Sequence, residues 1–316
     1  MQTRHPSNLH PYVVGLRHLG LACFTILAVP HIMADGFYVS QPDPFIVGWG
    51  RIDYVDSAGA VSGFYRGPGV PSGLAWDGTG YLYASFGDTI QRFGLDGQSS
   101  TFASGLNGAA GLAFDSSGNL FAANYNGNTI SRITPDGTVS TFATGLAFPT
   151  GLGFDSSGNL YCANRLNTSL SVFSPSGAVS SFGSGLEDPQ FVAFDRQHNL
   201  YVSIYGNDTP LRYTIARITP GGTVTTFASG LAQPAGLAFD SSGDLFVANR
   251  LGGGINRITP TGDMSVFATG LFLPEDLAAG PAPLVVPEPS TSLLLACGVL
   301  VCLCSRSRLM RRKPKS

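Results

Sequence analysis

Similar sequence segments recur along most of the chain, and in one of them two acidic residues, Glu275 and Asp276, replace the usual residues. Where this pair stands, related segments carry Ala235-Gly236 or Thr150-Gly151. Carboxylates are the oxygen ligands that calcium prefers, and a pair that occurs once can mark one site. Glu275 and Asp276 are therefore candidate metal ligands. We expect no cofactor, and the alternative is a divalent cation such as calcium. The plainer explanation of the acidic pair is that its carboxylates are solvated at the surface.

Large aromatic and basic side chains recur at equivalent places in these segments: Tyr125, Arg165, Tyr205 and Arg250, with Trp49 in a less regular one. Tyrosine, tryptophan and arginine contribute much of the binding energy at interfaces, and aromatic faces also stack on sugars. We interpret these five as candidate ligand-binding residues. The alternative is that they are ordinary variable loop tips.

Several catalytic arrangements are missing from the sequence, so no catalytic residue is assigned. There is no Gly-x-Ser-x-Gly elbow, no phosphate-binding loop and no paired-histidine helix. Of the five histidines only His198 lies beyond residue 34, within a turn. We interpret the recurrent Asn124, Asn164 and Asn249 as residues that hydrogen-bond within their own turns and not as metal ligands. A single metal site should be formed by residues that occur once and not by a periodic set.

The elements that must position these residues follow from a five-residue phrase that occurs five times. The aspartates that end it are 38, 40, 40 and 45 residues apart, a period typical of repeat folds. The copies are Gly73–Asp77, Gly111–Asp115, Gly151–Asp155, Phe191–Asp195 and Gly236–Asp240.

One repeat contains four short apolar or β-branched runs separated by turn residues. In the second copy these predicted strands are 111–114, 120–124, 130–134 and 138–143. Four antiparallel strands per forty residues, with no helical periodicity between residues 45 and 280, predict an all-β propeller. Its second-to-third and fourth-to-first strand loops should crowd one face around the central channel, where ligands are expected.

The ends of the chain complete the ring in this prediction. Residues 52–67 copy the last two strands of a repeat, and 45–49 can serve as the strand before them. The missing first strand comes from 274–279. We therefore predict six four-stranded blades, closed by pairing N-terminal and C-terminal strands, which leaves no open edge.

The pattern of Pro234 to Gly262 (PAGLAFDSSGDLFVANRLGGGINRITPTG) and its copies resembles NHL-type six-bladed propellers, in the wider group of gluconolactonase-like and streptogramin-lyase-like proteins. Resemblance to gluconolactonases implies that Glu275 helps hold a divalent ion that polarises a lactone carbonyl. Their Glu-Gly-Pro motif is absent, however, since Ser72-Gly73-Leu74 stands in its place. Resemblance to streptogramin lyases implies a catalytic histidine at the channel, which this sequence does not supply.

Residues 1–34 have the composition of a secretory signal peptide. They contain Arg4 and Arg17, no acidic residue, an apolar run over 19–29, and Ala34 at the expected cleavage site. A lipoprotein signal ending at Cys23 is the disfavoured alternative.

Residues 286–316 have three parts in order: Pro287-Glu288-Pro289, an apolar run over 291–304, and a basic end that holds six of the 18 lysines and arginines. This resembles the PEP-CTERM sorting signal, which implies recognition by an exosortase-type transpeptidase and a transient membrane anchor before cleavage. A retained tail anchor is the alternative.

Between these ends, residues 35–285 hold 19 acidic and 10 basic residues, a net charge of −9. No basic stripe could neutralise phosphates, so nucleic acid is not an expected partner. Cys162 is the single cysteine of this segment, so it has no internal disulfide partner and is expected to be buried.

Together these features predict an exported, non-catalytic binding or scaffold module at the cell surface or in extracellular matrix. Its partner would be a polysaccharide or a surface protein, and the alternative is a metal-dependent, gluconolactonase-like hydrolase.

Overall fold

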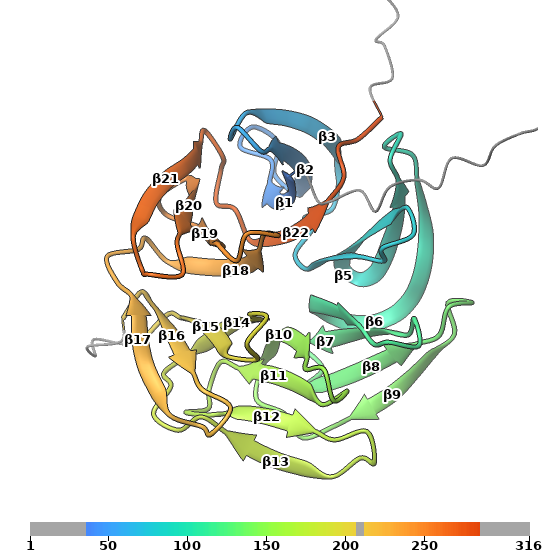
Figure 1. Cartoon of the computed structure of the whole chain (residues 1–316). Helices are drawn as coiled ribbons and strands as arrows, with labels where there is room; N and C mark the ends of the chain where they lie inside the picture. The colour runs from blue at the N-terminus through green and yellow to red at the C-terminus, as the bar shows by residue number, and fades with distance from the viewer. Residues whose placement is uncertain (1–35, 207–211, 285–316) are drawn as a thin grey trace, which may run out of the picture. The chain divides into compact units, whose positions relative to one another are not determined.

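The computed structural model describes residues 36–206 and 212–284, and their regular structure is entirely β (Figure 1). The predicted signal peptide and sorting signal lie outside these ranges. The described residues contain no helix that is long and apolar enough to cross a membrane.

The described strands form five hydrogen-bonded sheets. Four sheets have four strands, in the orders β22-β1-β2-β3, β10-β11-β12-β13, β14-β15-β16-β17 and β18-β19-β20-β21. The fifth has six strands, in the order β4-β5-β6-β7-β8-β9. The bounds are β1 Gly36–Pro42, β2 Trp49–Asp56, β3 Val61–Pro68, β4 Leu74–Trp76, β5 Tyr81–Gly94, β6 Ser99–Phe114, β7 Leu120–Asn124, β8 Thr129–Ile133, β9 Val139–Ala143, β10 Pro149–Phe154, β11 Leu160–Asn164, β12 Leu170–Phe173, β13 Val179–Phe182, β14 Pro189–Phe194, β15 Leu200–Ile204, β16 Thr214–Ile218, β17 Val224–Ala228, β18 Pro234–Phe239, β19 Leu245–Asn249, β20 Gly254–Ile258, β21 Met264–Thr269 and β22 Asp276–Gly280.

Five sheets stand where six separate blades were predicted, so that count was wrong. The reason is β6, which continues without a break from the last strand of one repeat into the first strand of the next. Its first part pairs with β5, and its last part pairs with β7 from Ala109 to Phe114. Glycines 105 and 108, both at positive φ, let the strand bend between these partners.

The predicted closure of the ring is present, because β22 pairs with β1 and joins the two ends of the described chain in one sheet. The strand next to it was misplaced in the prediction. It is Gly36–Pro42 and not 45–49, most of which forms a loop. Asp43 holds that loop, because its carboxylate accepts the backbone N–H groups of Phe45 and Ile46.

A buried glutamine ties this closing sheet to the repeat before it. Gln41 donates to the carboxylate of Asp53 and accepts the backbone N–H of Phe272 at 2.6 Å. Both side chains are buried, and desolvation raises the pKa of Asp53 against the opposing influence of Arg51. The amide therefore bonds a buried acid and a partly buried N–H at the seam of the ring.

We expect Gln41→Ala to lower the free energy of unfolding by about 2–3 kcal/mol, because the Phe272 N–H loses its acceptor and buried Asp53 loses one donor and keeps only Arg51. Urea denaturation of the two proteins measures this. The control is Gln91→Ala, since Gln91 bonds Thr101 at the surface and its loss should cost about 0.5 kcal/mol or less. Equal losses for the two variants would contradict a special role of Gln41.

Aromatic rings fill the contacts between successive repeats. A central ring from the second strand of each repeat contacts one phenylalanine from the outer strand and one aromatic residue beyond it, with centroids 4.4 to 6.1 Å from the central ring. The sets are Tyr38, Phe64 and Trp76; Tyr83, Phe102 and Phe114; Phe121, Phe142 and Phe154; Tyr161, Phe182 and Phe194; Tyr201, Phe227 and Phe239; and Phe246, Phe267 and Phe37.

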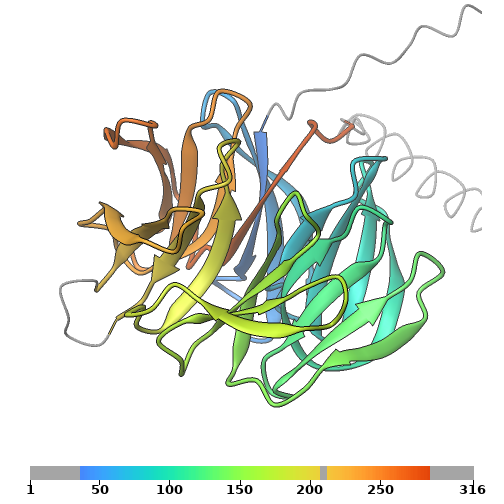
Figure 2. The same cartoon turned by 60° about the horizontal axis from the view of Figure 1, so that its bottom comes forward.

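The strands run between two faces (Figure 2). We call one the turn face, because it carries the turns that follow the inner strands, at 115–119, 155–159, 195–199 and 240–244. In the first of these, Asp115 accepts the N–H groups of Ser117 and Asn119, and the aspartates of the other three turns act in the same way. The repeated aspartate is thus a turn residue and not a ligand.

Both ends of the described chain lie at the turn face. Gly36, which begins β1, pairs with Gly280 at the end of β22, and Leu284 N–H donates to Leu95 in the turn between β5 and β6. The opposite face, which we call the mouth face, carries the β1–β2, β11–β12, β19–β20 and β21–β22 connections.

Candidate functional site

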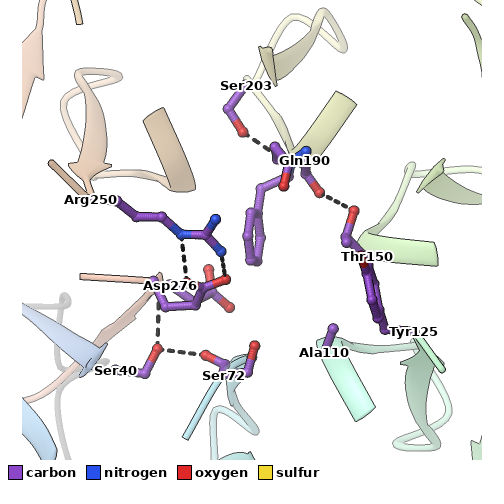
Figure 3. Close-up of polar contacts among 12 residues, drawn as sticks. Ser40, Ser72, Ala110, Tyr125, Thr150, Gln190, Ser203, Arg250 and Asp276 are labelled. Carbon is purple, nitrogen blue, oxygen red and sulfur yellow. Dashed lines mark hydrogen bonds and ion pairs between the residues drawn. The ribbon is translucent and has the colours of Figure 1, made fainter. Parts of the chain in front are cut away.

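Figure 3 shows the polar residues of the inner strands and adjoining loops, which face one another around the centre of the ring. The strands come close together here. Thr150 Oγ1 donates to Gln190 O of the next inner strand at 2.7 Å, and Ser85 Oγ donates to Ala110 O at 2.8 Å. The Thr150 bond joins β10 and β14, which belong to different sheets, and the Ser85 bond lies beside the backbone pairing of β5 with β6.

Glu275 and Arg250 form an ion pair at the mouth face. Nε of Arg250 donates to Glu275 Oε2 at 2.7 Å and Nη2 donates to Oε1, a two-point arrangement between the planar groups. About a quarter of each side chain is exposed, so the pair is half-buried rather than a free surface contact. The two residues belong to separate sequence-based hypotheses, Glu275 to the metal site and Arg250 to the ligand site, and the structure brings them together.

The ion pair lies in a pocket of about 450 Å³. Its polar side also includes Ser72 and Gln233, and its apolar side is formed by Pro42, Val70, Pro71 and Leu273. Backbone bonds connect these loops, since Arg250 N–H donates to Gln233 O and Glu275 N–H donates to Ser40 O. Ser72 and Gln233 were missed because no local signal distinguishes them from other loop residues.

Tyr125, Arg165 and Tyr205 form a second cluster on the mouth face. The Arg165 guanidinium lies 5.8 Å from the Tyr125 ring centroid and 5.7 Å from that of Tyr205. It also pairs with Asp188 through two contacts of 3.0 and 3.3 Å. The Asp188 hydrogen bond raises the pKa of Arg165 further. Three of the five candidate ligand-binding residues therefore lie together, and the guanidinium of Arg165, like that of Arg250, is paired with an acid that the hypothesis did not assign to it.

Asp276, the residue after Glu275, is buried beside the Arg250–Glu275 pair. Its Oδ2 accepts the N–H of Leu74 and its Oδ1 accepts its own neighbour's N–H, that of Leu277, each at 2.8 Å. Its backbone N–H donates to Ser40 Oγ, which donates in turn to Ser72 O (Figure 3). Desolvation raises the pKa of Asp276 to about 8, against the two N–H bonds and with a smaller contribution from Glu275. Asp276 thus links β22 to the segment before β4.

The metal hypothesis gains no support from this geometry. The carboxylate of Glu275 is engaged by Arg250, and that of Asp276 accepts backbone N–H groups. Within residues 36–206 and 212–284 no group of three or more acidic, histidine or cysteine side chains could hold a metal ion. Calcium needs six to eight oxygen ligands, which these two residues alone do not supply.

The remaining residues singled out by sequence lie elsewhere. Trp49 begins β2 and is 37% exposed, and no hydrogen bond or ring contact joins it to either mouth cluster in the described structure. His198 lies in a turn on the turn face, where Nδ1 is 3.3 Å from Ser156 Oγ. Cys162 is buried and free, as expected, and burial raises its pKa.

The repeated asparagines bond within their own hairpins, as predicted. Nδ2 of Asn124 donates to Thr129 and Ser131, and Nδ2 of Asn164 donates to Ser171. Nδ2 of Asn249 donates to Asn256 in the same way.

Comparisons with known proteins agree with this architecture. A chain of a nidogen–laminin complex superposes with a TM-score of 0.67 at 18% identity, covering 79% of this chain and 99% of that one. A gluconolactonase from Xanthomonas campestris gives 0.61 at 18% identity over 78% and 90% of the two chains. A virginiamycin B lyase from Staphylococcus aureus gives 0.54 at 20% identity over 65% and 73%. The chain is a β-propeller.

No family model and no curated protein sequence matches the chain. At these identities the structural neighbours establish the propeller fold alone, and they include a chain from a protein–protein complex as well as enzymes. The choice between binding and catalysis therefore has to come from the residues at the mouth of this propeller.

Proposed function

We propose that this propeller is exported, sorted by its C-terminal tail, and works as a non-catalytic binding module at the cell surface or in extracellular matrix, with the mouth face as its binding face. The observation that carries this proposal is the pairing of the polar groups at the mouth. Arg165 is paired with Asp188, and Arg250 with Glu275, so neither acid stands as a free base or metal ligand.

The position of the chain ends supports the same assignment. Gly36 and Leu284 lie at the turn face, so a membrane anchor at either end would leave the mouth face pointing away from the membrane. A partner in the surrounding matrix could then reach the pocket without displacing the anchor.

Processing at both ends belongs to this proposal and rests on the sequence. Removal of residues 1–34 and cleavage near Pro287-Glu288-Pro289 by an exosortase-type transpeptidase would release a product of about residues 35–286. Intact-mass measurement of the protein recovered from outside the producing cells tests this. A product that retains residues 291–304 would instead indicate a permanent tail anchor.

Binding is tested with the full chain and extracellular material from cells that produce it. We expect saturable binding that Arg250→Met weakens at least tenfold, since Glu275 would be left unpaired and the pocket reshaped. The matched control is Arg257→Met, which breaks the Arg257–Asp244 pair at the turn face and should leave binding unchanged. Equal binding by wild type and Arg250→Met would contradict the assignment of the mouth.

The competing hypothesis is a metal-dependent lactonase. It is tested by incubating the wild-type chain with glucono-1,5-lactone and calcium, with and without a chelator. We expect the lactone to disappear at its uncatalysed rate. Chelator-sensitive turnover that Glu275→Gln abolishes would replace the binding proposal with the enzymatic one.

A further inference from the structure

The pocket at the mouth has two chemically different sides. Pro42, Val70, Pro71 and Leu273 present aliphatic groups, and Val70 and Leu273 remain about two-fifths exposed. Ser72, Gln233 and the Arg250–Glu275 pair present polar groups on the other side. A ligand that fits both must have an apolar face and a polar edge.

The polar side has donors and acceptors that its internal bonds leave available. The ion pair uses Nε and Nη2 of Arg250, and no bond within the described chain uses Nη1. Gln233, which lines the pocket, donates through Nε2 to Tyr213 and keeps its Oε1 as an acceptor. Ser72 adds a hydroxyl. Two charged groups and two neutral ones thus offer donors and acceptors side by side.

The net charge of this side is close to zero, because the guanidinium and the carboxylate neutralise each other. An anion would meet the Glu275 carboxylate, and a cation would meet the Arg250 guanidinium, so a charged ligand would be repelled by one half of the pair. A neutral ligand with several adjacent hydroxyls matches both halves, since a hydroxyl donates and accepts.

Resting on the proposed binding function, we propose that this pocket binds the end of a neutral carbohydrate chain, with the C–H face of a sugar ring against Val70, Pro71 and Leu273 and its hydroxyls on the Arg250–Glu275 pair. The pocket volume of about 450 Å³ lies near the small end of ligand pockets, which run from roughly 300 to 1,000 Å³, and it suits a short glycan end better than a folded surface. A protein partner is the alternative that the test distinguishes.

Calorimetric titration of the full chain, purified in a detergent without a sugar head group, tests this. The probes are the neutral trimers of cellulose, laminarin, maltodextrin and chitin, and the acidic trimers of polygalacturonate and alginate. We expect at least one neutral trimer to bind, and the acidic trimers to bind at least tenfold more weakly. Tighter binding of the acidic trimers would overturn the proposal.

Two variants test the two sides separately. Glu275→Gln keeps the shape of the side chain but leaves the pocket with the Arg250 charge, so neutral trimers should bind about tenfold more weakly and acidic trimers more tightly. Leu273→Asn removes the aliphatic contact at a residue with φ of 50°, which asparagine tolerates, and should weaken neutral binding several-fold. Unchanged melting temperatures confirm folding. Arg257→Met is again the control that should change nothing.

The outcomes separate this inference from the proposed function. If no trimer binds but extracellular material is still captured in an Arg250-dependent way, the carbohydrate assignment is overturned and the binding module stands. If neither the trimers nor the extracellular material binds, the carbohydrate inference and the proposed binding function both fail. Neutral binding that Glu275→Gln and Leu273→Asn leave intact would show that the sugar binds outside this pocket, which also overturns the inference.

Discussion

Gly151→Ala is expected to destabilise the propeller by about 3 kcal/mol or more. Gly151 is the first residue of one copy of the repeated phrase and lies on an inner strand. A Cβ atom there would come within 2.5 Å of Phe191 Cα and 2.7 Å of Gln190 O, both backbone atoms of the next inner strand. Backbone atoms in a closed ring cannot move away one strand at a time, so the added methyl strains the ring itself.

The matched control is Gly153→Ala, two residues further along β10. A Cβ there would meet Val192 Cγ2 at 3.1 Å, the end of a side chain that can shift. Other repeats already carry alanine at this position, at Ala75, Ala113 and Ala238. We expect a change within about 0.5 kcal/mol, because the lost chain entropy of glycine offsets the tight contact.

Equilibrium denaturation of the wild type and the two variants measures both effects. Similar losses for Gly151→Ala and Gly153→Ala would show that close approach of the inner strands is not what the repeated glycine provides.

The second prediction concerns pH. Burial raises the pKa of Asp276 from its ordinary value near 3.8 to about 8. Between these values the folded protein holds a proton that the unfolded chain has lost. The free energy of unfolding should therefore fall by several kcal/mol as the pH rises from about 4 to about 8. Above that range Asp276 should contribute little further change.

Asp276→Asn should remove that slope, since an amide does not ionise. The variant also loses one acceptor for the N–H groups of Leu74 and Leu277, so it should be less stable than the wild type near pH 5 by about 1–3 kcal/mol. The difference should shrink or reverse near pH 8. Denaturation curves at several pH values give both quantities.

Comparison with the variant is needed because Asp53 also has a raised pKa and contributes a slope of the same sign. Glu275, which faces Asp276, is paired with Arg250 in both proteins. Parallel stability curves for wild type and Asp276→Asn would show that Asp276 is ionised in the folded state across this range, held by its two N–H bonds.

The sequence by itself determined the propeller, because a repeat must obey the same local physics each time it occurs. Asp115 and Asp155 cap their turns in the same way, and Asn124 and Asn164 bond the same strand of their hairpins. These interactions lie within a few residues of one another, so spacing and residue type are enough to predict them. The same holds for the burial of Cys162 within an apolar strand.

Tertiary structure alone decided the number of sheets, the strand that joins β22, and the partners at the mouth. Whether β6 bends into one strand or breaks into two depends on its neighbours, and the same glycine-rich sequence allows both. Arg250 and Glu275 are 25 residues apart, and Arg165 and Asp188 are 23 apart. Such pairs form because the ring brings loops of adjacent repeats together, and residues that vary from one repeat to the next leave no periodic signal of that contact.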